Sequence, residues 1–449
     1  MPTALSDHDL ATPIAHAADG PITAGRFHAE VLAWAARLPA GTPVLNTCQD
    51  RYLFMVGLGA AAVAGCVTLM PSNFAPHTVA QLRQRHPGLM GLHDGRDVID
   101  GLPALQLTSG AAPAGATAAA PLIDDEQVVA IVFTSGSTGE PTAHAKRWGR
   151  LCLNGAAEAR RLGARGMAIV ATVPPQHMYG FESSVLMALH GGASLWHGKP
   201  FFPSDICAAL AQVPRPRLLV TTPFHLAKLL DAGTPVPACD LVLSATAPLP
   251  TTLARRAEAA LAAPLMEIYG CTESGQVASR HPLEDPAWQL LPGVRMVQEA
   301  HGAVVHSGHV EGRVTLADAI EQVGSDRFHL IGRHADMVNI AGKRTSLAHL
   351  NAQLTAIPGV QDGAFLQLDE GDADATASVQ RLAALVVAPT LDAPSLLAAL
   401  RRRMDAVFLP RPLLLVDALP RNAASKLVRA DLLAAYHAAR RARADEGRA

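Results

Sequence analysis

The chain has few aromatic residues and no large excess of charge of either sign. Phe, Trp and Tyr together make up 4% of its 449 residues, and the formal net charge is −2. A near-neutral balance gives no electrostatic reason to expect a nucleic acid or an anionic membrane surface as a partner. The hydrophobic content of 49% is enough for a large core, and the length favours two or three domains. We therefore expect a globular protein with a small ligand.

Cysteine is also sparse. The six cysteines are scattered, with no C-x-x-C pair, and no histidine cluster stands at metal-binding spacing. This pattern argues against a disulfide framework and a zinc site, and it favours a reducing cytoplasm. The N-terminus has no basic cluster before an apolar run, so we do not expect a secretory signal.

One long uncharged run, residues 53–70, is near the length of a membrane span. Its glycines and alanines make it only weakly lipophilic, and Gly65 and Pro71 interrupt or end it. The pattern therefore predicts a buried helix, a turn and a short strand, and no stable insertion into a membrane.

Lysine is rare, because only five of the 37 basic residues are lysine and the rest are arginine. An ammonium group is a compact charge that can sit between two anionic oxygens, whereas a guanidinium prefers a planar fork. Lys343 and Lys426 fall in polar clusters near the C-terminus. For each of them, a substrate-binding cation and an ordinary exposed lysine remain the two interpretations.

Glycines and hydroxyls alternate in residues 134–139, Thr-Ser-Gly-Ser-Thr-Gly, directly after an apolar run. A buried strand that opens into such a loop presents backbone N–H groups and small donors to a polyanion such as a nucleotide triphosphate. The segment does not fit the G-x-x-x-x-G-K-[ST] loop, because no lysine follows Gly139. A polar turn between two core elements is the alternative.

Two further clusters are rich in polar groups. Residues 268–275 place an aromatic ring, a hydroxyl and a carboxylate close together after an apolar strand, which suits a base, a phosphate and Mg²⁺ held through oxygen. Residues 330–344 are dense in charge and precede a helical pattern that starts at Ser346. A solvated turn is the alternative for this third cluster.

The order of elements predicts an α/β fold. Apolar strand candidates at residues 168–173, 217–221, 240–243 and 266–269 alternate with helical stretches at 151–161, 224–230 and 253–262. Such alternation is typical of parallel sheets covered by helices.

Taken together, the segments 134–141, 269–273, 332–344 and 420–426, with Asp318, resemble the adenylate-forming superfamily of acyl-CoA synthetases, peptide-synthetase adenylation domains and luciferases. The resemblance implies that Mg·ATP and a carboxylic acid give an acyl-adenylate, whose acyl group then passes to a thiol. It also implies a large N-terminal domain with parallel-type sheets and helices, residues 1–331. A small mobile C-terminal α/β lid, residues 332–449, would carry the adenylating lysine and rotate between the two half-reactions.

The resemblance assigns a role to each matching residue. Tyr269 would lie against adenine, Thr272 would contact the α-phosphate, and Glu273 would bind Mg²⁺. Lys426 would bridge the substrate carboxylate and the α-phosphate. The remaining ATP contacts would be phosphate-binding Thr134, Ser135, Gly136, Ser137, Thr138 and Gly139, and ribose-binding Asp318 and Arg333.

On the acid side, His177 matches a histidine or aromatic near the acyl site, where it would gate or orient the acid. An interior histidine with satisfied hydrogen bonds is the alternative. Thr246, Ala247 and Pro248 stand in a segment, Ser-Ala-Thr-Ala-Pro, where many relatives have Ser-Gly-Gly-Ala-Pro beside the acyl pocket. Side chains in place of hydrogens narrow a tunnel, so we expect an aromatic or medium-size acid.

The chain departs from the family pattern at four positions. Thr142 follows Pro141 where a lysine is usual, so that Lys146 is the nearest cation, and its phosphate role is open. Ala335 replaces the charged pivot residue, and His349 and Ser425 replace a glutamate and a glycine. These departures indicate a divergent subgroup or the loss of one half-reaction.

Residues 174–182 also resemble the ligases of aryl-polyene pigment pathways, which implies an aryl or hydroxycinnamic acid loaded on an acyl carrier protein. The sequence does not separate the carrier protein from CoA as acceptor. Two alternatives stay open: a catalytically impaired regulatory subunit that binds nucleotide or acyl-adenylate, and an acyl-CoA synthetase for fatty acids.

Overall fold

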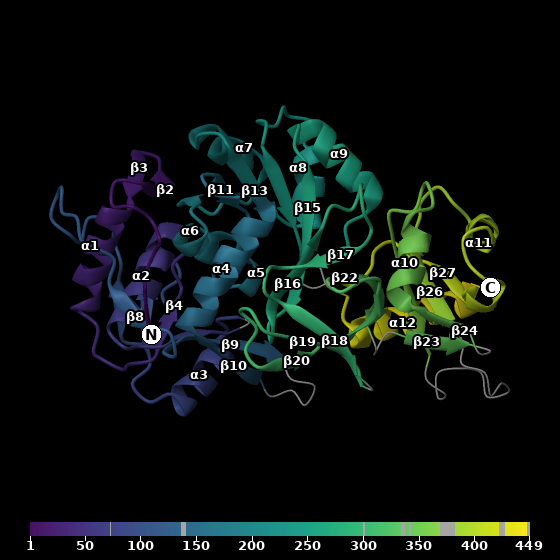
Figure 1. Cartoon of the computed structure of the whole chain (residues 1–449). Coiled ribbons are helices and arrows are strands. Elements are labelled where there is room, and N and C mark those ends of the chain that lie inside the picture. The colour runs from purple at the N-terminus through teal and green to yellow at the C-terminus, as the bar shows by residue number, and fades with distance from the viewer. Residues whose placement is uncertain are drawn as a thin grey trace. The chain divides into compact units, whose positions relative to one another are not determined.

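The computed structural model describes residues 1–71, 73–135, 141–299, 301–333, 337–340, 343–368, 382–421 and 427–446. The chain divides into two compact units (Figure 1). The first comprises Met1–Val297, Val304–Thr315 and Gly324–Arg327, and the second comprises Gln298–Ala303, Leu316–Val323 and Phe328–Ala449. The mobile lid that the resemblance implies from residue 332 onward stays a prediction.

The first unit contains a sheet with the strand order β10-β9-β5-β4-β6-β7. All neighbours are parallel except β10, which pairs antiparallel with β9 at the edge. The helix, turn and strand predicted for residues 53–70 are confirmed as α2 and β5. No helix among the described residues is long and apolar enough to cross a membrane. The elements are α2 (Arg51–Val63), β4 (Val44–Asn46), β5 (Thr68–Met70), β6 (Met90–His93), β7 (Ala104–Gln106), β9 (Val128–Ser135) and β10 (Pro141–Arg147).

A second sheet of this unit has the order β17-β16-β15-β14-β13-β11-β12-β2-β3. Strands β2, β12, β11, β13, β14 and β15 are parallel, and β16 turns back antiparallel to β15. The four predicted strand candidates are confirmed as β11, β13, β14 and β15. The bounds are β2 (Pro13–Ala17), β3 (Gly20–Thr23), β11 (Ala168–Ala171), β12 (Ser194–Trp196), β13 (Arg217–Thr221), β14 (Leu241–Ser244), β15 (Leu265–Cys271), β16 (Gly275–Arg280) and β17 (Trp288–Leu290).

The main core lies between these two sheets, where apolar residues of α1, α2, α4, α6 and the π-helix η1 pack against strands of both. A second core forms on the other face of the second sheet, under α7, α8 and α9 (Figure 1). Helix starts follow local chemistry: Asp50 caps α2 and Thr222 caps α8. The helices are α1 (Ala24–Ala35), α4 (Trp148–Leu162), α5 (Met178–Gly180), η1 (Phe181–Leu186), α6 (Met187–His190), α7 (Pro203–Gln212), α8 (Pro223–Asp231) and α9 (Thr251–Leu261).

Several smaller elements also belong to the first unit, and two of them, β18 and β19, have residues in both units. Strand β1 pairs antiparallel with β8, and β20 pairs antiparallel with β19. The bounds are β1 (Pro2–Ala4), α3 (Pro76–Arg85), β8 (Leu122–Asp124), β18 (Arg295–Glu299), β19 (Gly302–His306) and β20 (Arg313–Thr315).

The second unit is built around a sheet of order β25-β26-β27. Alternate residues of β26 face opposite cores, one formed with α10 and α11 and the other with α12. Two antiparallel pairs, β21 with β22 and β23 with β24, precede this sheet. The bounds are β21 (Asp318–Gln322), β22 (Arg327–Arg333), β23 (Met337–Ile340), β24 (Lys343–Ser346), α10 (Leu347–Thr355), β25 (Asp362–Gln367), β26 (Leu382–Val387), α11 (Ala393–Arg401), η3 (Ala406–Phe408), β27 (Leu413–Leu415) and α12 (Arg429–Glu446).

Candidate active site

The carboxyl ends of the parallel strands β11, β14 and β15 lie at one edge of the second sheet, because these strands run in the same direction. His177 follows β11, residues 246–248 follow β14, and Tyr269 stands near the end of β15. This edge is where open parallel sheets place their ligands. The Tyr179 hydroxyl lies 3.0 Å from the Thr221 carbonyl oxygen and 2.8 Å from that of Leu243, and it ties the segment after β11 to the ends of β13 and β14.

The turn between β15 and β16, residues 271–275, carries Thr272 and Glu273. The Lys146 ammonium reaches it from β10 and donates to the carbonyl oxygens of Thr272 (2.7 Å) and Glu273 (3.0 Å). Within the turn, the Ser274 hydroxyl donates to the Gly275 carbonyl oxygen at 2.8 Å. The Glu273 side chain remains 41% exposed. The backbone of the turn is thus held from inside while the carboxylate faces solvent.

Thr134 is the last residue of the predicted phosphate loop whose side chain is described, and a histidine lies between it and this turn. His144 Nε2 lies 3.0 Å from Thr134 Oγ1 and 3.8 Å from Glu273 Oε1. Burial lowers the pKa of His144, and the Glu273 carboxylate raises it. The predicted residues Gly136, Ser137, Thr138 and Gly139 lie outside the described residues, as does the side chain of Ser135. The structure therefore brings Thr134 and Glu273 to the same imidazole nitrogen.

Lys146 does not behave as an exposed lysine. The residue is 5% exposed, and its ammonium group contacts backbone carbonyl oxygens of the 271–275 turn. In this arrangement the Lys146 ammonium group binds the backbone of the turn. It does not stand in for the lysine that the family usually has at position 142.

Tyr269 lies on a stack of side chains. Its ring centroid is 5.5 Å from that of Trp288, and the Arg280 guanidinium lies 4.5 Å from the Trp288 ring centroid. Arg280 is in turn paired with Glu267 at 2.6 Å. Rings in this spacing attract each other, and a guanidinium over an indole adds a cation–π contact. These contacts hold the ring of the half-buried Tyr269 at the end of the strand.

The residues predicted for the acid are exposed. His177 caps the short helix α5, where its Nδ1 accepts the Tyr179 N–H at 3.4 Å. Its exposure excludes the interior-histidine alternative. Thr246, Ala247 and Pro248 are exposed too, and Thr246 adopts φ +80°. The Ser244 hydroxyl before them is buried and has no hydrogen-bond partner among the described residues.

In the second unit, Asp318 and Arg333 are direct neighbours across the β21–β22 pair. The two residues predicted for the ribose are therefore side by side in the backbone register, although the Arg333 side chain is outside the described part. Lys426 and Ala335 lie outside the described residues. The predicted helix after Ser346 is confirmed as α10, whose first turn is capped by the Ser346 hydroxyl.

The residues present fit a magnesium ion that is shared with a nucleotide. Among the described residues no group of three or more His, Cys, Asp or Glu could hold a metal by itself. Mg²⁺ commonly takes one or two carboxylates and completes its shell with substrate phosphates and water. The exposed Glu273 carboxylate, beside the Thr134 hydroxyl and His144, offers that kind of partial oxygen site.

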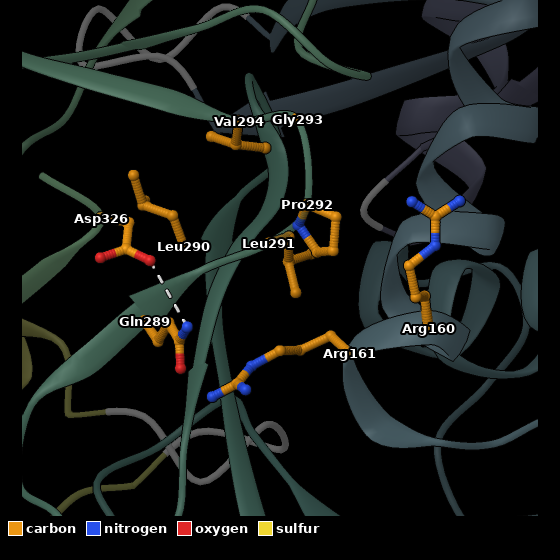
Figure 2. Close-up of a pocket in the computed structure, with 9 residues that line it drawn as sticks. All are labelled: Arg160, Arg161, Gln289, Leu290, Leu291, Pro292, Gly293, Val294 and Asp326. Atoms are coloured by element: carbon orange, nitrogen blue, oxygen red, sulfur yellow. Dashed lines mark hydrogen bonds between the residues drawn. The ribbon is translucent and has the colours of Figure 1, made fainter.

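A cavity of about 390 Å³ lies elsewhere on the first unit, between the last turn of α4 and β17 (Figure 2). Arg160 and Arg161 approach it from α4, and Gln289 donates to Asp326 at 3.4 Å on the opposite side. Its lining includes none of the residues predicted for ATP or the acid.

Sequence reasoning missed two residues of this region. His144 lies just past the predicted phosphate loop, and its role follows from sharing a face of β10 with Lys146. The sequence analysis covers Glu182 only as part of residues 174–182 and predicts no role for it. A single carboxylate shortly before the apolar run 185–189 was the available signal, because such a charge is buried only with partners.

The chain is similar to known proteins of one enzyme family. Residues 22–317 match the family model described as AMP-binding enzyme. The chain is 31% identical over 239 residues to a 4-coumarate–CoA ligase of Rhodobacter capsulatus, covering 53% of this chain and 60% of that relative. It is 30% identical over 306 residues to a 4-coumarate–CoA ligase of Halorhodospira halophila, covering 66% and 73%.

The fold is also similar to that of ATP-bound MatB from Rhodopseudomonas palustris, with a TM-score of 0.77, 21% identity and coverage of 95% of this chain and 96% of that one. The α/β fold class and the resemblance to adenylate-forming enzymes are thereby confirmed. ATP as cosubstrate and AMP-forming acid–thiol ligation as activity class are confirmed at the level of the family. The chain belongs to the AMP-binding enzyme family.

Proposed function

We propose that this protein activates an aromatic or hydroxycinnamic-type carboxylic acid with Mg·ATP and transfers the acyl group to the thiol of CoA or of an acyl carrier protein. The observation that carries the proposal is the joint position of Thr134, His144 and the 271–275 turn beside the strand ends that bear Tyr269 and residues 246–248. The similarity to two proteins named 4-coumarate–CoA ligase supports an aromatic acid.

In the first half-reaction, a carboxylate oxygen of the acid forms a bond to the α-phosphorus of ATP, and pyrophosphate leaves. Negative charge builds on the oxygens around that phosphorus, so fixed donors and cations lower the barrier. Thr272 would donate to the α-phosphate, and Lys426 would bridge it to the acid. Bound Mg²⁺ would supply charge neutralisation at the phosphates, held by Glu273.

The other ATP contacts would come from three segments of the chain. Thr134, Ser135, Gly136, Ser137, Thr138 and Gly139 would hold the β- and γ-phosphates, and Tyr269 would lie against adenine. Asp318 and Arg333, which are cross-strand neighbours, would take the ribose hydroxyls.

In the second half-reaction, the thiol sulfur attacks the acyl carbonyl carbon, AMP leaves with the electron pair of the broken bond, and the thiol proton passes to solvent. Rotation of the lid, residues 332–449, against residues 1–331 would exchange Lys426 for a surface that admits the thiol. We place the reaction in a reducing cytoplasm, since all six cysteines are free.

On the acid side, His177 would orient or gate the substrate, and Thr246, Ala247 and Pro248 would line the entrance of its pocket. Their side chains, in place of glycine hydrogens, favour a flat acid over a long alkyl chain.

A second candidate function is a regulatory subunit that binds nucleotide or acyl-adenylate without turnover. It is favoured by Thr142 and Ala335, which replace charged residues of the family pattern. A fatty acyl-CoA synthetase is the remaining enzyme alternative, and it would be distinguished by its preference for long-chain acids.

The test is acid-dependent ATP–pyrophosphate exchange with aryl, hydroxycinnamic, medium-chain and long-chain acids. We expect exchange with aromatic acids, and a loss of about 10²–10³-fold in Lys426→Ala, because a fixed transition-state cation is removed. Lys228→Ala, a change of an exposed lysine on α8, serves as the matched control. Binding of ATP without exchange for any acid would favour the regulatory subunit, and exchange with long-chain acids alone would favour the fatty acyl-CoA synthetase.

A further inference from the structure

Two charged residues are buried together beneath the 271–275 turn. Lys146 comes from β10 and is 5% exposed, and Glu182 comes from the π-helix η1 and is 3% exposed. Charged side chains are rarely buried to this degree unless they are paired. The proposed chemistry uses neither of them directly, so their position calls for a separate explanation.

Lys146 acts on the backbone of the turn. Its ammonium group donates to two consecutive carbonyl oxygens, those of Thr272 and Glu273. Because each peptide unit is planar, aiming two successive carbonyls at one point fixes the orientation of two successive peptide planes. The directions in which the Thr272 and Glu273 side chains leave the backbone are fixed with them.

Glu182 acts on the other end of the turn. Its Oε1 accepts the backbone N–H of Gln276 at 3.2 Å and the Asn154 amide at 2.9 Å. Gly275 lies directly over this carboxylate: a Cβ there would stand 2.5 Å from Glu182 Oε1, and the residue adopts φ +74°. Only glycine fits both the space and the left-handed backbone at this point. The turn is thus anchored at both of its ends.

The two charges also depend on each other. Burial lowers the pKa of Lys146, and the strongest opposing influence is the Glu182 carboxylate. Burial raises the pKa of Glu182 to about 7, and Lys146 is the first influence against that rise. Opposite charges buried near each other are seldom a net source of stability compared with apolar residues of similar volume. Its presence here is better explained by the geometry that it imposes on the turn.

We propose that Lys146 and Glu182 are positioning residues that hold the 271–275 turn so that Thr272 and Glu273 meet the α-phosphate and Mg²⁺ of bound ATP. The inference rests on the proposed function for the roles of Thr272 and Glu273. Lys146 is the first cation after the phosphate loop, in which Thr142 replaces the usual lysine. In this proposal Lys146 binds the backbone of the 271–275 turn and does not bind a phosphate.

The test uses the double variant Lys146→Met/Glu182→Gln in the full-length protein. Methionine keeps the length of the lysine stem without its donors, and glutamine retains an acceptor for the Gln276 N–H and for Asn154. Removing both charges together avoids leaving either one buried without its partner. Lys228→Met, on an exposed face of α8, is the matched control.

The readout is Mn²⁺ binding, measured by electron paramagnetic resonance in the presence of a non-hydrolysable ATP analogue. We expect the double variant to bind Mn²⁺ about 10–100-fold more weakly, since residues that orient a metal ligand have effects of that size. The KM for the acid should stay within about twofold of the wild type, while the control variant matches the wild type in every readout. Lys146→Arg, which keeps a donor to the carbonyls, should recover part of the affinity.

A folded double variant with wild-type Mn²⁺ affinity would overturn the proposal, and so would a variant that fails to fold, because the pair would then serve the fold alone. Exchange by the wild-type protein is measured separately. If the wild type binds Mn²⁺ and the analogue but activates no acid, the proposed function fails while the positioning proposal is still decided by the binding data.

Discussion

The turn proposed for ATP, residues 271–275, and the segment proposed for the acid, residues 244–248, follow neighbouring strands of one sheet but differ in their supporting contacts. Lys146 donates to two carbonyl oxygens of the turn, and Glu182 accepts the backbone N–H of Gln276 directly after it. The acid-side segment is exposed from Thr246 to Pro248, has a non-glycine residue at φ +80°, and begins with a buried hydroxyl that has no partner among the described residues.

This difference matches the two kinds of ligand. ATP is the same in every turnover, so a rigid turn that fixes a carboxylate and a hydroxyl is an advantage for phosphate chemistry. The acid is the variable substrate, and a loosely supported segment can change its side chains without disturbing the sheet. We therefore expect changes in the turn to affect all acids equally and changes in the segment to reorder the acids.

The largest effect is expected from Glu273→Gln. Loss of the proposed magnesium ligand should lower acid-dependent exchange by about 10²-fold, and by a similar factor for every acid in the panel. Raising the Mg²⁺ concentration should restore part of the activity. The measurement is exchange as a function of Mg²⁺, with Glu126→Gln, at a residue 82% exposed, as control. A loss confined to one acid would contradict the assignment of this turn to ATP.

A smaller effect on activity is expected from Thr246→Gly. Glycine relieves a left-handed backbone that costs threonine about 1 kcal/mol and widens the pocket entrance. The ratio of kcat/KM values between a long and a flat acid should shift about threefold to tenfold toward the long one, with an unchanged KM for ATP.

Ala262→Gly is a matched control for this variant, because Ala262 also has a positive φ, +50°, at the end of α9. It should raise the thermal midpoint without changing the order of the acids. If Thr246→Gly gave the same result, the segment would have no part in acid selection.

The smallest effect on activity is expected from His309→Asn. This variant tests whether His309, which contacts the strand after the turn, makes the stability of the protein depend on pH. His309 is 4% exposed, its Nε2 lies 2.6 Å from the Gln276 carbonyl oxygen, and its Nδ1 has no partner among the described residues. Burial lowers the pKa of His309 to about 4. As the pH falls below 6.5, His309 is protonated in the unfolded chain but stays neutral in the folded protein. The free energy of unfolding therefore decreases progressively between pH 6.5 and pH 4.

This loss amounts to about 3 kcal/mol at most. The variant should therefore show a flatter dependence of unfolding free energy on pH between 6.5 and 4, measured by urea denaturation at several pH values. His77→Asn, at an exposed histidine, should keep the slope of the wild type. An unchanged slope in His309→Asn would show that this histidine does not carry the acid sensitivity.

Much of the fold was accessible from local pattern. The strand predicted at residues 217–221 is β13 with the same bounds, and the uncharged run at 53–70 is a helix followed by a strand. These predictions succeeded because apolar periodicity and glycine or proline boundaries are local properties of the chain. The motif order was equally visible, and the family match confirms what it indicated.

The supports of the site were not accessible in this way. His144, Lys146 and Glu182 come from β10 and η1, at least 88 residues before the turn that they serve. No local rule connects positions so far apart, and a lysine on a strand looks the same in sequence whether it is exposed or buried. His177 shows the same limit, since only its exposure in the structure separated the two interpretations.

The sequence by itself thus determined the α/β class and the type of chemistry, because these depend on periodicity and on residue types at fixed spacing. The tertiary structure decided which charges are buried and what they hold. Burial and pairing arise only when the two sheets close on the central helices and bring distant side chains within hydrogen-bond distance.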